Sequence, residues 1–160
     1  MVHVYVGLGS NLDNPQGQVR KALEELAQLP KCQLLQASKL YSSKPVGPQD
    51  QDDFVNAVAL LATELDAHEL LDQLQALEQQ HQRQRVRHWG PRTLDLDILL
   101  FGDQQVHSQR LTIPHVEMAK RGFVVGPLAE LSPQLMMPDG TSVQQLLAQC
   151  PIDDLICLGP

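Results

Sequence analysis

The fold is decided by the stretch His88-Trp89-Gly90-Pro91-Arg92-Thr93-Leu94-Asp95-Leu96-Asp97-Ile98-Leu99-Leu100-Phe101-Gly102. A Gly-Pro pair, which favours a turn, leads into an apolar run that two carboxylates interrupt. The apolar residues 94, 96 and 98 alternate with Asp95 and Asp97, which is the period of a β-strand. Positions two apart on a strand share a face. We therefore predict that the two carboxylates stand side by side, with apolar side chains in the core behind them.

Two adjacent carboxylates repel each other unless a cation lies between them. Mg²⁺ commonly takes one or two carboxylates and completes its shell with water and substrate phosphates, which makes Asp95 and Asp97 candidate metal ligands. Arg92, just before the strand, could contact those phosphates. The simpler interpretation is that the Asp-x-Asp pair lies on the solvent-exposed face of an antiparallel sheet. Taken alone, the pair favours this interpretation.

Composition describes an ordinary globular protein. The 160 residues predict a single domain over 1–160, with 42% hydrophobic and 19% charged residues. No apolar run reaches membrane-spanning length, and the start of the chain lacks the pattern of a secretory signal. Three cysteines without zinc-like pairing indicate reduced thiols, so we expect a cytoplasmic protein.

The charges are unevenly distributed. A net charge of -7 argues against broad nucleic-acid binding, which depends on a basic surface. Four of the twelve basic residues nevertheless fall within ten positions, at Arg83, Arg85, Arg87 and Arg92. Beside an Asp pair, this concentration indicates one small polyanion as ligand. The alternative is a solvated loop or helix end.

Apolar periodicity predicts an ordered series of elements. Strands are expected at 3–7, 32–42, 53–63 and from 94 onward, and helices at 15–29 and 67–82. A last helix begins at a cap, Thr141 or Ser142, and runs to Gln149. The glycine-containing run 7–11 is expected to be a turn, 44–52 a loop, 116–123 a short helical segment, and the tail from Pro151 irregular.

This order is that of an α+β, ferredoxin-like fold, an antiparallel sheet with helices on one face. The other face is then free to carry Asp95, Asp97, Phe54 and Asn56. Asn56 is a polar residue in the middle of an apolar strand. It is either hydrogen-bonded in the core or placed to contact a ligand, and the residues alone do not separate these possibilities.

Several motifs, in order, resemble one family. The run 92–99, preceded by His88-Trp89-Gly90-Pro91, looks like the signature of 6-hydroxymethyl-7,8-dihydropterin pyrophosphokinase, the 2-amino-4-hydroxy-6-hydroxymethyldihydropteridine diphosphokinase of folate biosynthesis. Similar matches are Gly9-Ser10-Asn11, Gly47-Pro48-Gln49-Asp50-Gln51 with Phe54 and Asn56, Arg110-Leu111-Thr112-Ile113-Pro114-His115, and Arg121-Gly122-Phe123. The resemblance covers nearly the whole chain.

The resemblance implies a magnesium-dependent enzyme that transfers the terminal pyrophosphate of ATP to the pterin hydroxymethyl oxygen and leaves AMP. Two Mg²⁺ ions would be held by Asp95 and Asp97, and phosphates would be clamped by Arg83, Arg85 and Arg92. The implied ATP-site residues are Gln75, Glu78, His88, Trp89, Arg92, Ile98, Arg110, Thr112, His115 and Arg121. The implied pterin-site residues are Ser43, Val46, Phe54, Asn56, Trp89 and Phe123. The partners would be ATP and the pterin, without nucleic acid or membrane, and the protein would be a monomer.

The chain departs from the family pattern at a few points. His88 stands where an arginine is often found, Phe54 and Val116 replace common tyrosines, and the segment 78–89 looks about one residue short. No general base is obvious, and for His115 we favour a phosphate contact. We expect segments 44–52 and 82–92 to be mobile and to close over substrates.

Two other classes of function compete with this one. A ferredoxin-like fold could equally carry a non-catalytic nucleotide-binding regulator. An RNA-binding module is a third possibility, disfavoured by the net charge and by the lack of an aromatic RNA-binding strand.

Overall fold

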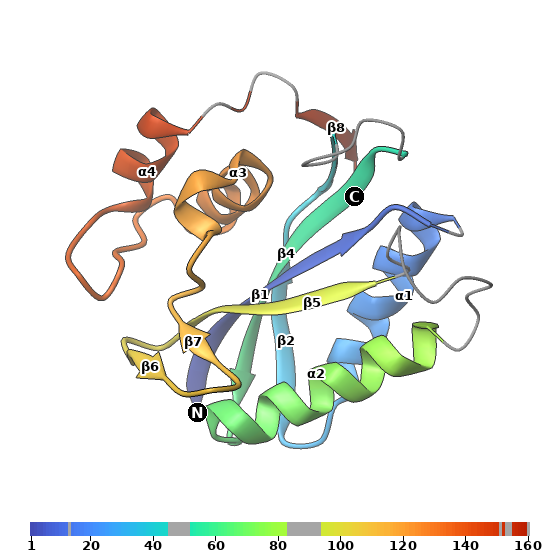
Figure 1. Cartoon of the computed structure of the whole chain (residues 1–160), viewed down its shortest axis with the longest axis horizontal. Helices are drawn as coiled ribbons and strands as arrows, with labels where there is room; N and C mark the ends of the chain where they lie inside the picture. Colours follow the sequence, from blue (N-terminus) through green and yellow to red (C-terminus); the bar gives the residue numbers. More distant parts are fainter. Residues whose placement is uncertain (13, 45–51, 83–93, 151, 153–154, 160) are drawn as a thin grey trace.

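An antiparallel β-sheet with four α-helices forms the body of the computed structural model, which describes residues 1–12, 14–44, 52–82, 94–150, 152 and 155–159 (Figure 1). The strands are β1 (Val2–Ser10), β2 (Cys32–Ala37), β3 (Leu40–Ser43), β4 (Phe54–Thr63), β5 (Asp95–Phe101), β6 (Val106–His107), β7 (Thr112–Ile113) and β8 (Ile156–Gly159). The helices are α1 (Pro15–Ala27), α2 (Ala67–Gln82), the 3₁₀ turn η1 (Met118–Lys120), α3 (Gly122–Leu131) and α4 (Val143–Gln149).

The strand order of the main sheet is β5-β1-β4-β3-β8. Its pairs are antiparallel, and β2 pairs with the other half of β4, so that β2 and β3 act as one strand interrupted after Ala37. Strand β1 pairs with β4 on one side and with β5 on the other. The α+β class and the antiparallel sheet predicted from the sequence are confirmed.

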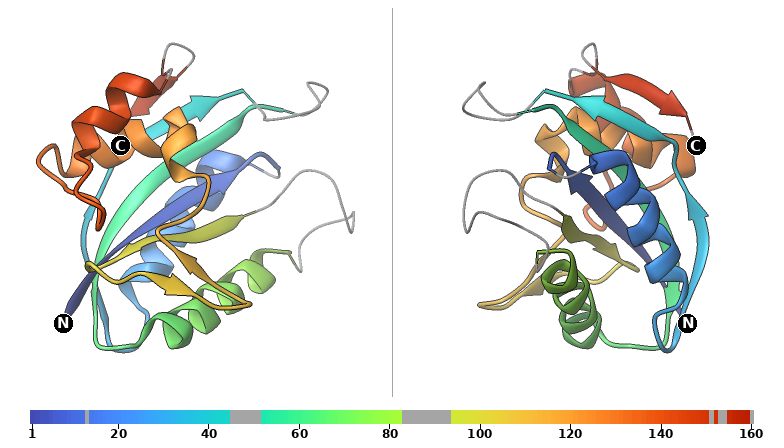
Figure 2. Two further views of the ribbon diagram at one scale, coloured as in Figure 1. Left: turned by 60° about the vertical axis from the view of Figure 1, so that its left-hand side comes forward. Right: turned by 90° about the vertical axis from the view of Figure 1, so that its right-hand side faces the viewer.

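Helices lie on both faces of this sheet. Val4, Val6 and Leu8 of β1 share one core with α1 and α2. Tyr5 of the same strand faces the opposite way, into a second core with α3 and α4. In both views of Figure 2, α3 and α4 lie together at the end of the molecule away from α2. The predicted arrangement on one face therefore holds for α1 and α2, whereas α3 and α4 add a layer on the other face.

Strand β4 shows the effect of this double cover. Nine of its ten residues are buried, because helices and neighbouring strands enclose it from both sides. Its sequence accordingly reads as an almost continuous apolar run, the pattern of a strand buried on both faces. Asn56 is the polar exception within that run, and it lies at the end of the strand that α3 and α4 leave uncovered.

The structure confirms some predicted boundaries and corrects others. Helix α2 has the predicted bounds, and Ser142 caps α4 with a reciprocal hydrogen-bond pair to Gln145. The expected turn at 7–11 is wrong, since β1 continues to Ser10 and its glycines pair with strands on both sides. The tail is not irregular throughout, because Ile156–Gly159 pairs with β3.

The helical segment expected at 116–123 is reduced to the short turn η1, and the longer helix, α3, follows it. Helix α3 is apolar nearly all round, since it packs between the sheet and α4. A residue pattern without a polar face gives no helical period, and for this reason the sequence did not reveal α3.

The apolar stripe of α2 ends in a polar residue, His81, which is 4% exposed. Its Nε2 lies 2.6 Å from Oε1 of Glu25, and its Nδ1 contacts Oε1 of Gln18. Both partners belong to α1, so this buried polar group joins the two helices where α2 ends. Within the described ranges, no helix is both long and apolar enough to cross a membrane.

Replacing Leu61 in the centre of β4 by alanine should lower the free energy of unfolding by about 2–5 kcal/mol, because a fully buried leucine leaves a cavity. Leu35→Ala on β2 is the matched control, and its side chain is 42% exposed. We expect this control to change stability by less than about 0.5 kcal/mol. Chemical denaturation measures both values, and similar losses in the two variants would contradict the packing described here.

Candidate active site

Two glycines of β1 form the floor of a cavity on the open part of the second sheet face. In the sheet register, Gly9 lies between Asn56 of β4 and Asp95 of β5, and Gly7 lies opposite Asp97. Because neighbouring strands are about 4.8 Å apart, Asn56 and Asp95 stand on the order of 10 Å from each other across the glycine. A flat ligand can therefore lie directly on the backbone between a polar amide and a carboxylate.

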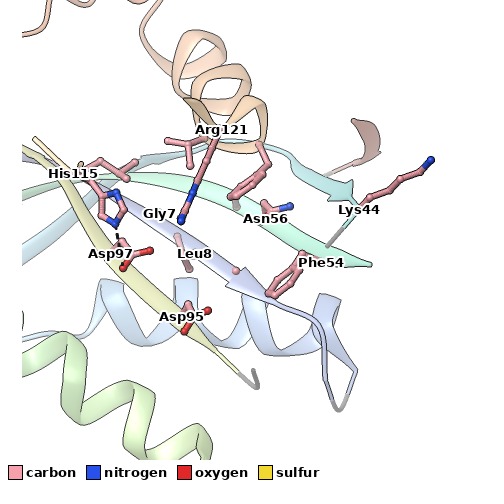
Figure 3. A pocket seen from close by; sticks show the side chains of 14 residues that line it. Gly7, Leu8, Lys44, Phe54, Asn56, Asp95, Asp97, His115 and Arg121 are labelled. Atoms are coloured by element: carbon pink, nitrogen blue, oxygen red, sulfur yellow. Dashed lines mark ion pairs between the residues drawn. The ribbon is translucent and has the colours of Figure 1, made fainter. Parts of the chain in front are cut away.

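The cavity has a volume of about 210 Å³, and its lining comes from four elements, β1, β4, β5 and α3, together with residues of the connecting segments (Figure 3). The sheet contributes Gly7, Gly9, Phe54, Asn56, Asp95 and Asp97, and the segment from β7 to α3 contributes His115, Arg121, Phe123 and Val124. We call it the sheet pocket. Helix α3 closes one side, which is why the additional layer of helices matters for the site.

The two carboxylates lie on the face predicted from the alternation. Asp95 and Asp97 are partly exposed, whereas Leu94, Leu96 and Ile98 are buried in the core behind them. Figure 3 shows both carboxylates along β5 at the edge of the sheet pocket. The strand therefore fixes two oxygen donors in one row without exposing its apolar residues.

Asn56 is both hydrogen-bonded in the protein and directed at the cavity. Its Nδ2 donates to Oγ of Ser43 at 2.7 Å and to the backbone carbonyl of Tyr41 at 3.4 Å. A carbonyl can only accept, so these contacts fix the orientation of the amide. Its Oδ1 lies on the side of Gly9, 3.5 Å from where a Cβ would stand on that residue. The side chain thus offers the sheet pocket an acceptor, and both of the alternatives raised by the sequence apply.

Aromatic rings border the polar floor. Phe54 lies at one end of the pocket and Phe123 begins the wall made by α3. The guanidinium carbon of Arg121 is 5.7 Å from the ring centroid of Phe123, within range of a cation–π interaction. The pocket therefore combines apolar surfaces for a ring system with a cation and two carboxylates.

A second cavity, of about 360 Å³, lies on the other side of β5 and is enclosed by α2 and the β6–β7 segment. We call it the helix pocket. Its polar lining is formed mainly by Gln75, Glu78, Asp97, Arg110, Thr112 and His115. Asp97 and His115 line both pockets, so the two cavities meet at this pair.

His115 is oriented by its own backbone environment. Its Nδ1 accepts a hydrogen bond of 3.2 Å from the backbone N–H of Glu117. In the neutral ring the proton is therefore on Nε2, which lies 4.0 Å from Oδ1 of Asp97 (Figure 3). His115 thus presents a donor at the junction of the two pockets.

Glu78 joins α2 to the edge of the sheet. Its Oε2 accepts a hydrogen bond of 2.9 Å from the backbone N–H of Leu96. Leu96 stands between the two aspartates, so this contact fixes β5 at the point where the carboxylates emerge. Glu78 therefore supports the geometry of the pair as well as lining the helix pocket.

A hydrogen bond connects β3 to α3, the helix that closes one side of the sheet pocket. The phenol of Tyr41 donates to Oε1 of Glu130 at 2.5 Å, and this contact links β3 to α3. Partial burial and then the neighbouring carboxylate raise the pKa of Tyr41 well above its ordinary value. The phenol therefore remains a donor at any physiological pH, and the link between β3 and α3 persists.

The carboxylate pair fits a hard divalent cation. Asp95 and Asp97 supply oxygen donors, and in the described part of the chain no group of three or more His, Cys, Asp and Glu could hold a metal. A site with only two protein carboxylates suits Mg²⁺, which keeps water and substrate phosphates in its shell. It does not resemble a closed structural zinc site, which takes four protein ligands.

The structure brings most of the predicted site residues to these two cavities. Phe54, Asn56, Asp95, Asp97, Arg121 and Phe123 line the sheet pocket, and Gln75, Glu78, Ile98, Arg110, Thr112 and His115 line the helix pocket. Arg121 was placed with ATP in the sequence analysis but lines the sheet pocket. Ser43 lies behind Asn56 as its hydrogen-bond partner. Val46, Arg83, Arg85, His88, Trp89 and Arg92, like most of the two segments expected to be mobile, lie outside the described residues.

Sequence reasoning missed the glycine floor and Lys44, which lines the sheet pocket. The period-two alternation could have revealed the glycines, because Gly7 and Gly9 fall on the face opposite the buried residues Val6 and Leu8. Lys44 stands beside a stretch rich in proline and glycine, and no periodic pattern in the sequence predicts that it lies next to the sheet pocket.

Fold and site together define an α+β ligand-binding protein in which two adjoining pockets share a carboxylate and a histidine. The profile of one family, described as 7,8-dihydro-6-hydroxymethylpterin-pyrophosphokinase (HPPK), matches residues 5–133. The chain belongs to this family. The family predicted from the sequence motifs is therefore confirmed.

Individual relatives agree over nearly the full length. The chain is 51% identical over 152 residues to a 2-amino-4-hydroxy-6-hydroxymethyldihydropteridine pyrophosphokinase of Pseudomonas aeruginosa, covering 95% of this chain and 94% of that protein. It is 46% identical over 160 residues to the protein of the same name in Haemophilus influenzae, covering 100% of both.

Solved structures support the fold. A crystal structure of HPPK-DHPS in complex with substrates superposes with a TM-score of 0.72 at 12% identity, over 93% of this chain and 45% of that one. Wild-type Plasmodium falciparum HPPK-DHPS with pteroate gives 0.72 at 14% identity, over 92% and 42%. The chain thus spans less than half the length of these two proteins, and the likeness shows the fold alone.

Removing the hydroxyl that holds Asn56 should weaken the fold measurably. Ser43→Ala deletes a buried hydrogen bond, so we expect a loss of about 1 kcal/mol in the free energy of unfolding. Ser42→Ala, on the neighbouring position of β3, is the control, because the described residues show no side-chain hydrogen bond for Ser42. Urea denaturation compares the two, and an equal effect would show that the Asn56 contact does not stabilise the sheet.

Proposed function

We propose that the sheet pocket binds 6-hydroxymethyl-7,8-dihydropterin, that the helix pocket binds ATP, and that the terminal pyrophosphate of ATP passes to the pterin hydroxymethyl oxygen, leaving AMP. Family membership makes the chain an enzyme, a pyrophosphokinase of folate biosynthesis. The observation that carries our assignment of the two sites is the meeting of the two pockets at Asp97 and His115. A transfer between two bound molecules requires such a shared boundary.

The sheet pocket suits a flat heterocycle that carries N–H donors. The backbone of Gly7 and Gly9 provides a flat floor, and Phe54 and Phe123 provide aromatic surfaces that can pack against a ring system. Oδ1 of Asn56 accepts a hydrogen bond from the pterin edge. With its edge at Asn56, the ring system extends across Gly9 toward the carboxylates of β5.

The helix pocket suits a nucleotide and its phosphates. Arg110, Thr112 and the Nε2–H of His115 are donors that can contact phosphate oxygens. Gln75 and Glu78 lie on the facing wall formed by α2. The phosphate chain would then point to the junction of the two pockets.

Asp95 and Asp97 are the residues that would hold the two magnesium ions of the reaction. When bound, these ions supply charge neutralisation for the polyphosphate and the departing AMP. The protein contributes position. It aligns the hydroxymethyl oxygen of the acceptor with the phosphate chain, and it excludes competing water from the junction.

The arginines at 83, 85 and 92 remain predicted phosphate contacts. The two magnesium ions, the monomeric state and the cytoplasmic location also remain predictions.

A non-catalytic regulator would bind the nucleotide in the same cavities. The discriminating experiment mixes the protein with ATP, Mg²⁺ and 6-hydroxymethyl-7,8-dihydropterin and measures AMP by chromatography. AMP formation that requires the pterin supports the proposed function, and nucleotide binding without AMP formation refutes it.

Neutralising either carboxylate should abolish turnover. Asp95→Asn and Asp97→Asn keep the size of the side chain but lose the charge that a divalent ion requires, so we expect kcat to fall at least ~100-fold. Asp103→Asn, in the turn after β5, removes the same charge outside both pockets and should leave AMP formation unchanged. Full activity in either pocket variant, with a normal melting temperature, would remove the metal assignment.

Filling the glycine floor should affect the pterin more than the nucleotide. A Cβ on Gly9 meets Oδ1 of Asn56 at 3.5 Å, which is ordinary contact, so the strand tolerates a side chain. Gly9→Ala should raise the KM for the pterin moderately and Gly9→Val by about 10-fold or more, since each added methyl occupies space needed by the ring. The KM for ATP should change less than two-fold. A larger effect on ATP than on the pterin would reverse the assignment of the pockets.

A further inference from the structure

One face of α2 carries a polar stripe directed at the helix pocket. His68, Asp72, Gln75 and Glu78 are spaced by four, three and three residues, so they lie on one side of the helix. Gln75 and Glu78 were predicted site residues, whereas Asp72 carries no role in the site described so far. The contacts of this stripe show that it also holds the opposite wall of the pocket.

That wall is the turn at residues 108–111 between β6 and β7. The backbone N–H of Leu111 donates to Oγ of Ser108 at 3.1 Å, and that of Ser108 donates to the carbonyl of Leu111 at 2.9 Å, so the turn is closed on itself. Nε2 of His68 lies 2.9 Å from Oγ of Ser108. The stripe is thus attached at one point to the turn, through the Ser108 hydroxyl that also closes the turn.

The second attachment is made by Arg110, whose side chain lines the helix pocket. Nη2 of Arg110 donates to Oδ1 of Asp72 at 2.6 Å and to Oε1 of Gln75 at 3.0 Å. One guanidinium nitrogen therefore has two acceptors on successive turns of α2. These two contacts restrict the orientation of the guanidinium, whose other donors are available to a ligand in the helix pocket.

The exposure of the two side chains indicates how much the ion pair of Arg110 and Asp72 contributes to the stability of the fold. The side chains of Arg110 and Asp72 are 48% and 60% exposed, so their attraction is screened and adds little to the stability of the fold. A long arginine side chain without partners would, however, sample many rotamers, and ordering it on binding costs affinity. Asp72 removes part of that cost before the ligand arrives.

We propose that Asp72 is a positioning residue for nucleotide binding: it contacts no ligand itself and holds the guanidinium of Arg110 at the wall of the helix pocket. This inference rests on the proposed function of that pocket. The alternative role is an opposing one, in which the negative charge of Asp72 repels the polyphosphate and competes with it for Arg110. The two roles predict opposite effects when the carboxylate is removed.

The test compares Asp72→Ala with Asp72→Asn. Because the lost contact is an exposed ion pair, Asp72→Ala should weaken binding of a non-hydrolysable ATP analogue by about two- to five-fold in calorimetry. The KM for ATP should rise by the same factor with kcat and the KM for the pterin unchanged. Asp72→Asn retains an acceptor for Arg110 and should stay closer to the wild type than Asp72→Ala. Tighter binding in either variant, or unchanged binding in Asp72→Ala, overturns the proposal.

A double-mutant cycle tests whether Asp72 acts through Arg110. Arg110→Ala should weaken nucleotide binding, and adding Asp72→Ala to it should cause no further loss. Additive losses would show that Asp72 acts independently, and would also overturn the proposal. Glu64→Gln, before the start of α2, is the control for the change in net charge and should bind like the wild type.

The outcome is separable from that of the proposed function. Wild-type protein that binds the ATP analogue but forms no AMP with the pterin would refute the transferase assignment, whereas the binding measurements would still decide the role of Asp72. Wild-type protein that forms AMP, with Asp72→Ala indistinguishable from it in binding and in KM, would refute the positioning role alone.

Discussion

The register of β1 between β4 and β5 is the constraint on which the site depends. It places Gly9 between Asn56 and Asp95, and Gly7 opposite Asp97, so that a side-chain-free row separates an amide from two carboxylates. A shift of one residue would turn these groups into the core and bring Val6 and Leu8 to the surface. The apolar residues behind them therefore fix the polar groups in front, and stability and binding depend on the same register.

The second layer of helices turns this row into a cavity. Helix α3 packs on the far half of the sheet face, and the segment that precedes it brings His115 and Arg121 to the open half. On the other side of β5, α2 encloses the helix pocket with Gln75 and Glu78 and orients Arg110. The ferredoxin-like core thus supplies the floor, and the parts added around it supply the cations and donors. As a result, the edge strand β5 borders both pockets.

The sequence predicted those features that depend on local periodicity. The alternation around Asp95 and Asp97 gave the shared face, and the apolar stripe of α2 gave its bounds. Helix α3 and strand β8 were missed, because a uniformly apolar helix has no period and a short terminal strand is defined only by its partner. The glycines of β1 locally favour a turn, and only their tertiary pairing with β4 and β5 makes them part of a strand. The roles of Asp72 and Lys44 likewise depend on neighbours far away in the sequence.

The central claim is that donor and acceptor meet at Asp97 and His115, with one substrate in each pocket. A crystal structure with a non-hydrolysable ATP analogue, Mg²⁺ and 6-hydroxymethyl-7,8-dihydropterin tests it most directly. The account predicts the pterin on Gly7 and Gly9 with its edge at Asn56, the nucleotide against α2, and electron density for the ions at Asp95 and Asp97. Ions bound elsewhere, or both substrates on the same side of β5, would contradict it.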